Sequence, residues 1–175
     1  MNNEQSMQIS AHILGENSDR LHLEGRSQFQ QACEHMAQQA SYHIDIFSYD
    51  LDKPLYDQVG FIDAIKTLSL HQRGLSVRIL IQNSDTVQRE GHRLLELARR
   101  LTSKIEIKRP HEDYIDHAEN FMIVDKIGYI RRKTTDRYEG EANFCDRLGS
   151  KLLYEFFSTI WERSEPESML RRLYI

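Results

Sequence analysis

The chain has 175 residues, of which 39% are hydrophobic and 29% charged, and its formal net charge is −4. A chain of this length buries roughly 70% of its unfolded surface, so one domain can form without disulfides or a structural metal. No apolar run approaches the roughly 18 residues of a membrane helix, and the first residues lack a signal-peptide pattern, so we expect a cytoplasmic protein. The two cysteines and eight histidines show no zinc-ligand spacing, and we expect no metal and no cofactor.

Charge is distributed unevenly along the chain. Residues 1–64 carry 3 basic and 10 acidic side chains, residues 65–110 carry 10 and 4, and residues 111–175 carry 10 and 13. The basic middle segment could form a surface that faces phosphate groups. Its charges could equally lie on the solvated faces of two helices, which is how most charge runs are used.

Strands and helices are predicted to alternate from residue 21 onward. Residues 1–20 are polar and are expected to be flexible, residues 21–165 to form the domain, and residues 166–175 to form a tail. Apolar residues that recur at intervals of three and four predict helices at 27–40, 61–72, 84–101 and 145–163, with caps at Ser27 and at Ser84 or Asp85. Strands are predicted at 21–24, 42–49, 77–81, 105–108, 121–124 and 128–132, a loop around Pro54 and Gly60, and a short turn or strand at 170–175.

This order of elements predicts an α/β fold. Strands that alternate with helices of this length form a sheet whose two faces must both be covered. We therefore expect a mixed β-sheet flanked by helices on both faces.

The most informative segment is residues 117–125, with the sequence His-Ala-Glu-Asn-Phe-Met-Ile-Val-Asp. It has a polar start, an apolar strand and a terminal acid. The segment resembles the H-x-K-x4-D motif of the phospholipase D-like superfamily. Residues 40–51, 73–81 and 152–162 are similar to further passages of a single-motif unit of that superfamily. The resemblance spans roughly residues 25–165 and extends to an uncharacterised bacterial domain of this type.

The resemblance implies a phospholipase D-like fold and a phosphodiesterase chemistry. In active members one histidine attacks phosphorus, a second protonates the leaving oxygen, and lysines hold the phosphoryl oxygens. Single-motif members usually form dimers that bring two copies of the motif together. The chemistry needs an unprotonated imidazole at the phosphorus and fixed cations around it.

The chain departs from this motif at its catalytic positions. When the segment is aligned on its strand, Ala118 takes the place of the histidine and Asn120 that of the lysine, and only Asp125 is retained. His117 precedes the histidine position by one residue, and Glu119 would repel phosphate. His117, Asn120 and Asp125 are therefore the candidate site residues of a degenerate motif, in which Asp125 is expected to be a turn residue.

A basic run stands where the superfamily has a second catalytic element. Arg131, Arg132 and Lys133 are the best remaining candidates to bind phosphate. Alternation along a strand predicts that Arg131 and Lys133 point to one side and Arg132 to the other. The same run could instead be an exposed edge strand kept soluble by its charge.

Three hypotheses for the function remain open. In the first, a catalytically degenerate domain serves as a binding or assembly module for nucleic acid or another phosphate-containing ligand. In the second, an active phosphodiesterase or nuclease uses His117 as its nucleophile. In the third, the chain is a structural domain that docks on a protein partner or on itself, and a homodimer is expected by analogy with the superfamily.

Overall fold

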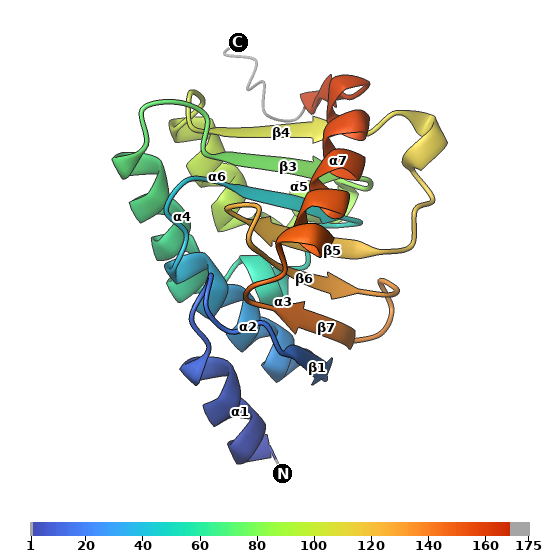
Figure 1. Cartoon of the computed structure of the whole chain (residues 1–175). Helices are drawn as coiled ribbons and strands as arrows, with labels where there is room; N and C mark the ends of the chain where they lie inside the picture. The colour runs from blue at the N-terminus through green and yellow to red at the C-terminus, as the bar shows by residue number, and fades with distance from the viewer. Residues whose placement is uncertain (1, 169–175) are drawn as a thin grey trace.

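A single mixed sheet organises the computed structural model, which describes residues 2–168 (Figure 1). Its eight strands follow the order β1-β7-β6-β5-β2-β3-β4-β8. The central trio β2, β3 and β4 is parallel, whereas the remaining pairs are antiparallel. The strands are β1 (Arg20–Glu24), β2 (Ile44–Ser48), β3 (Val77–Ile81), β4 (Ile105–Arg109), β5 (Asn120–Val124), β6 (Gly128–Arg132), β7 (Glu139–Asn143) and β8 (Glu165–Pro166).

Helices cover both faces of this sheet, as predicted. A large apolar core joins one face to several helices, and on the opposite face a smaller cluster joins the sheet to α7, with Tyr114 packed against it. Successive side chains of a strand point to opposite faces of the sheet, so neighbouring residues such as Ile46 and Phe47 belong to different apolar clusters. The helices are α1 (Asn2–Ala11), α2 (Arg26–Gln38), α3 (Lys53–Tyr56), α4 (Val59–His71), α5 (Asp85–Glu90), α6 (Arg93–Arg100) and α7 (Arg147–Glu162), and η1 (Glu112–Tyr114) is a short 3₁₀ helix.

The N-terminal segment differs from the prediction of a flexible stretch. Residues 2–11 form α1, and Ile9 is only 2% exposed within the main core. The hydroxyl of Ser6 donates a hydrogen bond of 2.8 Å to Gln31 on α2. Helix α1 is mostly polar and weakly amphipathic in sequence, so its single buried isoleucine gave no periodic pattern from which a helix could be predicted.

Backbone breaks explain the other differences in the helices. The helix predicted at 84–101 is two helices, because Gly91 adopts φ 73° and His92 caps the second one by accepting a hydrogen bond from the amide of Leu94. Helix α2 is preceded by Gly25 and has no side-chain cap, so the predicted cap at Ser27 is wrong. The loop predicted around Pro54 contains α3.

Two strands, β7 and β8, have no counterpart among the predicted elements. Strand β7 consists of residues with weak strand preference, and its place in the sheet comes from pairing with β6 and β1. Strand β8 pairs with the end of β4. The turn or strand expected at 170–175 lies outside the described residues. Within residues 2–168, no helix is long and apolar enough to cross a membrane.

Asp125 ties the start of β2 to the turn between β5 and β6. Its carboxylate accepts hydrogen bonds of 2.7, 2.8 and 2.8 Å from the backbone amides of Ser41, Tyr42 and His43. Asp125 and Lys126 both have positive φ, a conformation that aspartate tolerates better than most residues. The prediction that Asp125 is a turn residue is confirmed, and its carboxylate also holds a segment more than 80 residues away.

Replacing Asp125 by alanine should lower the free energy of unfolding by about 2 kcal/mol, because three backbone amides lose a charged acceptor. Urea unfolding followed by circular dichroism measures this change. The control is Asp63→Ala, which removes an exposed carboxylate from α4. Equal unfolding midpoints for the two variants would show that the carboxylate of Asp125 contributes nothing to the fold.

Candidate functional site

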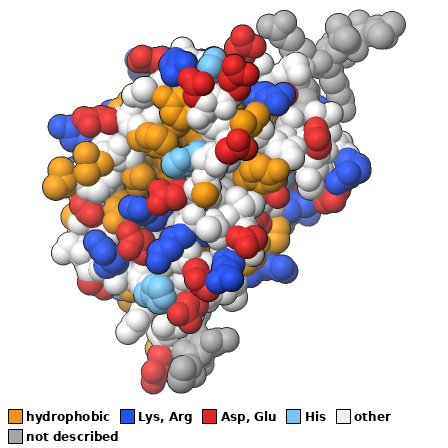
Figure 2. Space-filling model, turned by 90° about the vertical axis from the view of Figure 1, so that its right-hand side faces the viewer, with side chains coloured by type: hydrophobic (Ala, Val, Ile, Leu, Met, Phe, Trp, Pro, Cys, Tyr) orange, Lys and Arg blue, Asp and Glu red, His pale blue; other side chains and the backbone are white. Residues whose placement is uncertain are grey.

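Residues 117–120, the first part of the motif, lie at the sheet edge where β2 and β3 end, whereas Asp125 lies at the opposite end of β5. Residues 111–119 and residues 133–138 form connections at this edge, before β5 and after β6. We call this region the motif edge. Figure 2 looks onto this side of the molecule, where hydrophobic side chains gather above and acidic and basic side chains are interspersed below. The mixture of charges distinguishes the motif edge from a uniformly basic phosphate site.

His117 packs into an aromatic cluster beside α7. Its ring lies 5.3 Å from Phe47, in an edge-on arrangement, and 4.9 Å from Phe156, measured between ring centroids. The Nε2 atom is buried and has no hydrogen-bond partner. Burial lowers the pKa of His117, and nearby Glu119 opposes only part of this shift. The imidazole is therefore neutral near pH 7, but its Nε2 atom is not accessible to a substrate.

Gln82 positions the backbone that carries His117. Its Nε2 atom donates to the carbonyl oxygens of Tyr114, Ile115 and His117, each at 2.9 Å. The side chain is 2% exposed and its Oε1 atom is buried without a partner. No motif in the sequence marks Gln82, and its only signal is that a polar residue directly follows the apolar strand 77–81.

Asn120 is a buried hydrogen-bonding residue at the start of β5. Its Oδ1 atom accepts from the amide of Tyr49 at 2.8 Å, and its Nδ2 atom donates to the carbonyl of Ala118 and to the hydroxyl of Thr135. The side chain is 4% exposed. Ala118 is exposed and carries no reactive group. Asp125 lies at the far end of the same strand, so the three candidate residues do not converge on one point.

The basic run on β6 divides as alternation predicted. Arg132 is buried and forms an ion pair of 2.7 Å with Asp52, whereas Lys133 is exposed. Arg131 forms an ion pair of 2.8 Å with Glu119. The expectation that Arg132 binds phosphate is therefore corrected, because its guanidinium lies inside the protein and Asp52 already neutralises it.

Neither a cluster of metal-ligating side chains nor a reactive thiol at Cys33 occurs in the described part of the chain. No group of three metal-ligating side chains occurs among residues 2–168. Cys33 is buried in the core, and burial raises the pKa of its thiol to about 12, so it is not a thiolate at neutral pH.

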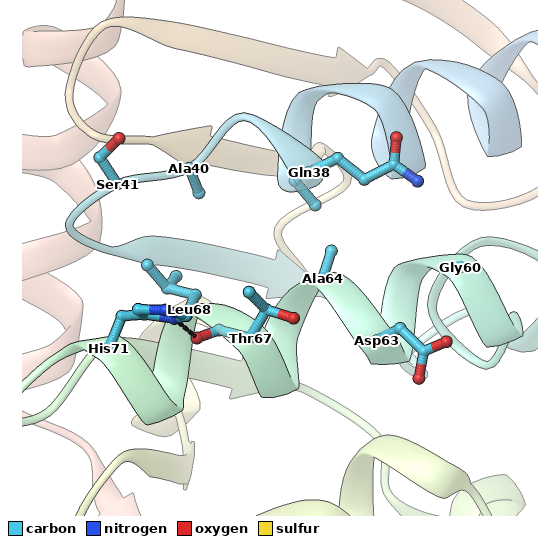
Figure 3. A pocket seen from close by; sticks show the side chains of 10 residues that line it. Gln38, Ala40, Ser41, Gly60, Asp63, Ala64, Thr67, Leu68 and His71 are labelled. Atoms are coloured by element: carbon cyan, nitrogen blue, oxygen red, sulfur yellow. Dashed lines mark hydrogen bonds between the residues drawn. The ribbon is translucent and has the colours of Figure 1, made fainter.

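A groove away from the motif edge lies between α2 and α4. It has a volume of about 560 Å³, and Figure 3 shows small side chains such as Ala40 and Ala64 along it. Asp63 and His71 are about two turns apart on α4, too far for a shared proton. The Nδ1 atom of His71 bonds to the carbonyl of Thr67. This groove holds no pair of groups that could act together on a substrate.

Comparisons with known proteins identify the fold and the family. A family model described as Domain of unknown function (DUF7931) matches residues 25–173. No curated protein sequence matches the chain. Among solved structures, the chain is similar to TrmBL2, an archaeal chromatin protein described as showing a novel mode of DNA binding, with 17% identity and a TM-score of 0.61. The match covers 85% of this chain and 53% of TrmBL2, so the chain spans about half the length of that protein.

Two further solved structures, Nuc and NucT, match this chain over a larger share of their own length than TrmBL2 does. Nuc from Salmonella typhimurium, a phospholipase D family member, is 12% identical with a TM-score of 0.54, and the match covers 77% of this chain and 88% of Nuc. NucT from Helicobacter pylori is 11% identical with a TM-score of 0.56, and the match covers 86% of this chain and 98% of NucT. Likeness at these identities shows a shared fold and leaves activity open. The chain belongs to the family described as Domain of unknown function (DUF7931), and its fold is phospholipase D-like.

Proposed function

We propose that this chain is a non-catalytic phospholipase D-like module that binds a phosphate-containing partner, and that this partner is a nucleic acid. The main support for a loss of catalysis is that Ala118 and Asn120 occupy the positions of the catalytic histidine and lysine. Ala118 has no atom that could attack phosphorus, and the amide of Asn120 is neutral and already bonded to Ala118 and Thr135. A phosphohistidine mechanism has neither its nucleophile nor its cation here.

The neighbouring histidine does not replace the missing nucleophile. A nucleophile must bring a lone pair within about 3 Å of the reacting atom. The buried Nε2 atom of His117 lies against Phe47 and Phe156. The carboxylate of Glu119, paired with Arg131, occupies the same short segment and disfavours an approaching phosphate.

The connection between β6 and β7 supplies the cations for binding. Lys133 and Arg137 are exposed, and neither forms an ion pair within the described part of the chain. A phosphate at these two side chains would be held by charge and without base-specific contacts. TrmBL2, the structural neighbour with the description of DNA binding, supports nucleic acid as the ligand class by analogy of fold.

Phosphodiester hydrolysis should be absent. Wild type and His117→Ala are each incubated with single-stranded DNA, RNA and a chromogenic phosphodiester, and both should give the rate of buffer alone. Loss of a nucleophile typically costs on the order of 10⁴–10⁶ in rate, so an active enzyme would separate clearly from this background. Hydrolysis by wild type that disappears in His117→Ala would establish the nuclease hypothesis instead.

Replacing His117 by phenylalanine should preserve or raise the free energy of unfolding at pH 7, by up to about 1 kcal/mol, because a buried atom without a partner is removed. The pKa of His117 is lowered in the folded state from the ordinary histidine value near 6.5. Near and below that pH, the unfolded chain therefore binds more protons at this histidine than the folded chain does. Stability should therefore fall as pH drops through 6.5, and this fall should be shallower in His117→Phe.

Urea unfolding at pH 7.5 and pH 5.5 measures both effects. His43 and His92 also have lowered pKa values from burial, so part of the pH dependence persists in the variant. The control is His22→Phe, since His22 is exposed on β1. Destabilisation by His117→Phe that exceeds the control would mean that the imidazole makes an interaction that phenylalanine cannot replace.

Binding to single-stranded nucleic acid should weaken steeply with salt. The slope of log K against log salt reports the phosphates contacted, at roughly −0.7 per phosphate for single strands. The double variant Lys133→Ser/Arg137→Ser should flatten the slope by about 1 to 2. The control Arg73→Ser/Arg100→Ser removes two exposed cations from the opposite end of the parallel strands. A larger change in the control would place the contact on the basic middle segment.

A further inference from the structure

A polar cavity lies next to the motif edge, between the connection after β2, helix α5 and the connection after β6. It has a volume of about 310 Å³, and we call it the Asp50 pocket. Thr135 belongs both to this pocket and to the motif edge, because it accepts a hydrogen bond from Asn120. The residues that line the pocket include Asp50, Asp52, Glu90, Thr86, Thr135 and Tyr138.

The Asp50 pocket carries uncompensated negative charge. Asp52 is neutralised by Arg132, but neither Asp50 nor Glu90 forms an ion pair within residues 2–168. The ammonium of Lys53, at the pocket, lies 3.9 Å from the carboxylate of Asp57 and donates a hydrogen bond of 3.4 Å to the carbonyl oxygen of Glu90. The pocket therefore has more carboxylates than cations.

The histidine at the pocket does not offset this charge. The Nε2 atom of His92 lies 3.0 Å from the carbonyl oxygen of Leu51, and its Nδ1 atom accepts a hydrogen bond from the amide of Leu94. An imidazole that donates from one nitrogen and accepts at the other is neutral. Burial lowers the pKa of His92, in agreement with this assignment.

Asp50 lacks a hydrogen-bond donor on one side of its carboxylate. The Oδ1 atom is buried and has no partner, and burial, together with the nearby charge of Asp52, raises the pKa of Asp50. A buried polar atom without a partner typically costs about 1–3 kcal/mol. Asp50 lines the pocket, so a cation held there would offset the charge of a carboxylate that forms no ion pair within residues 2–168.

We propose that the Asp50 pocket binds a protonated amine or guanidinium group, with Asp50 and Glu90 as the acids that hold it. An anion is excluded by the two uncompensated carboxylates. A divalent metal ion would need several oxygen ligands around one point, and the described residues provide no group of three. The volume matches the lower end of small-molecule sites, so one cationic head group and a short chain fit.

This pocket is a site additional to the proposed phosphate contact, and it takes a ligand of opposite charge. The ammonium or guanidinium group could belong to a free amine or to the side chain of a basic peptide. Both sources present the same N–H donors to the carboxylates. The two sources are distinguished by the probes in the experiment.

The experiment is a titration of the ¹⁵N-labelled protein, followed by amide chemical shifts. The probes are agmatine and a blocked tripeptide with a central lysine, and inorganic phosphate is the anionic control. Saturable shifts at Thr86, Glu90 and Thr135 are expected with agmatine, with the peptide, or with both. No saturable shift with either cationic probe would overturn the proposal, whatever the outcome of the hydrolysis and salt experiments.

Variants test which acids hold the cation. Asp50→Asn and Glu90→Gln should each raise Kd about tenfold, the equivalent of one charge-assisted hydrogen bond. Asp85→Asn, an exposed acid in the first turn of α5 outside the pocket, should leave Kd unchanged. Glu90 is exposed, so Glu90→Gln should fold normally, and urea unfolding checks Asp50→Asn. A Kd unchanged in both pocket variants would overturn the assignment.

Discussion

The buried ion pair between Arg132 and Asp52 determines the character of the motif edge. It joins the end of β6 to the start of α3, and the hydroxyl of Tyr138 donates to the same carboxylate at 2.8 and 3.0 Å. Removing one partner of such a pair typically costs about 3–5 kcal/mol, because the other charge is left buried and alone. The pair therefore fixes the end of β6, the connection after β2 and the connection after β6 relative to one another.

The same ion pair has consequences for ligands on both sides of it. The guanidinium of Arg132 is buried and paired with Asp52, so it cannot bind a phosphate at the surface. Asp52 is neutralised while Asp50, two residues earlier, is not, which leaves the neighbouring pocket negative. One interaction thus removes a cation from the motif and leaves an acid in the pocket beside it.

Two positions of the motif serve the architecture. Asp125 accepts three backbone amides at one end of β5, and Asn120 bonds to three partners at the other. A lysine at position 120 would place a charge where the side chain is now buried and satisfied, at a desolvation cost. The substitutions at this motif therefore fit their surroundings as parts of a folded edge.

Much of the fold could be predicted from the sequence, because the strands of the parallel trio and helices α2, α4 and α7 carry strong apolar periodicity. The break at Gly91 could not, since one glycine inside a helical pattern is often tolerated. Strand β7 depends on its neighbours for its place in the sheet, and no local pattern marks it. Pairwise alternation gave the opposite directions of Arg131 and Arg132 correctly, but the burial of Arg132 depends on Asp52, 80 residues away.

The surroundings of His117 could not be predicted from the sequence either, because the residues that contact it lie far away along the chain. Its ring contacts Phe47 and Phe156, which lie on a distant strand and a distant helix, and Gln82 holds its backbone from a third element. The sequence identified the histidine as a candidate from its place beside the motif. Only the three-dimensional contacts reveal that an apolar cluster surrounds it and leaves its Nε2 atom without a partner.

The connection after β6 brings opposite charges close together. Lys133 and Arg137 are exposed on it, whereas Thr135 and Tyr138 line the Asp50 pocket. Exposed charges are screened over about 8 Å at physiological salt, and buried ones much less. Phosphate binding at the two cations should therefore be weak and sensitive to salt, because the neighbouring acids oppose it. A cation held in the pocket would neutralise part of that opposition, so the two ligands should favour each other's binding by linkage.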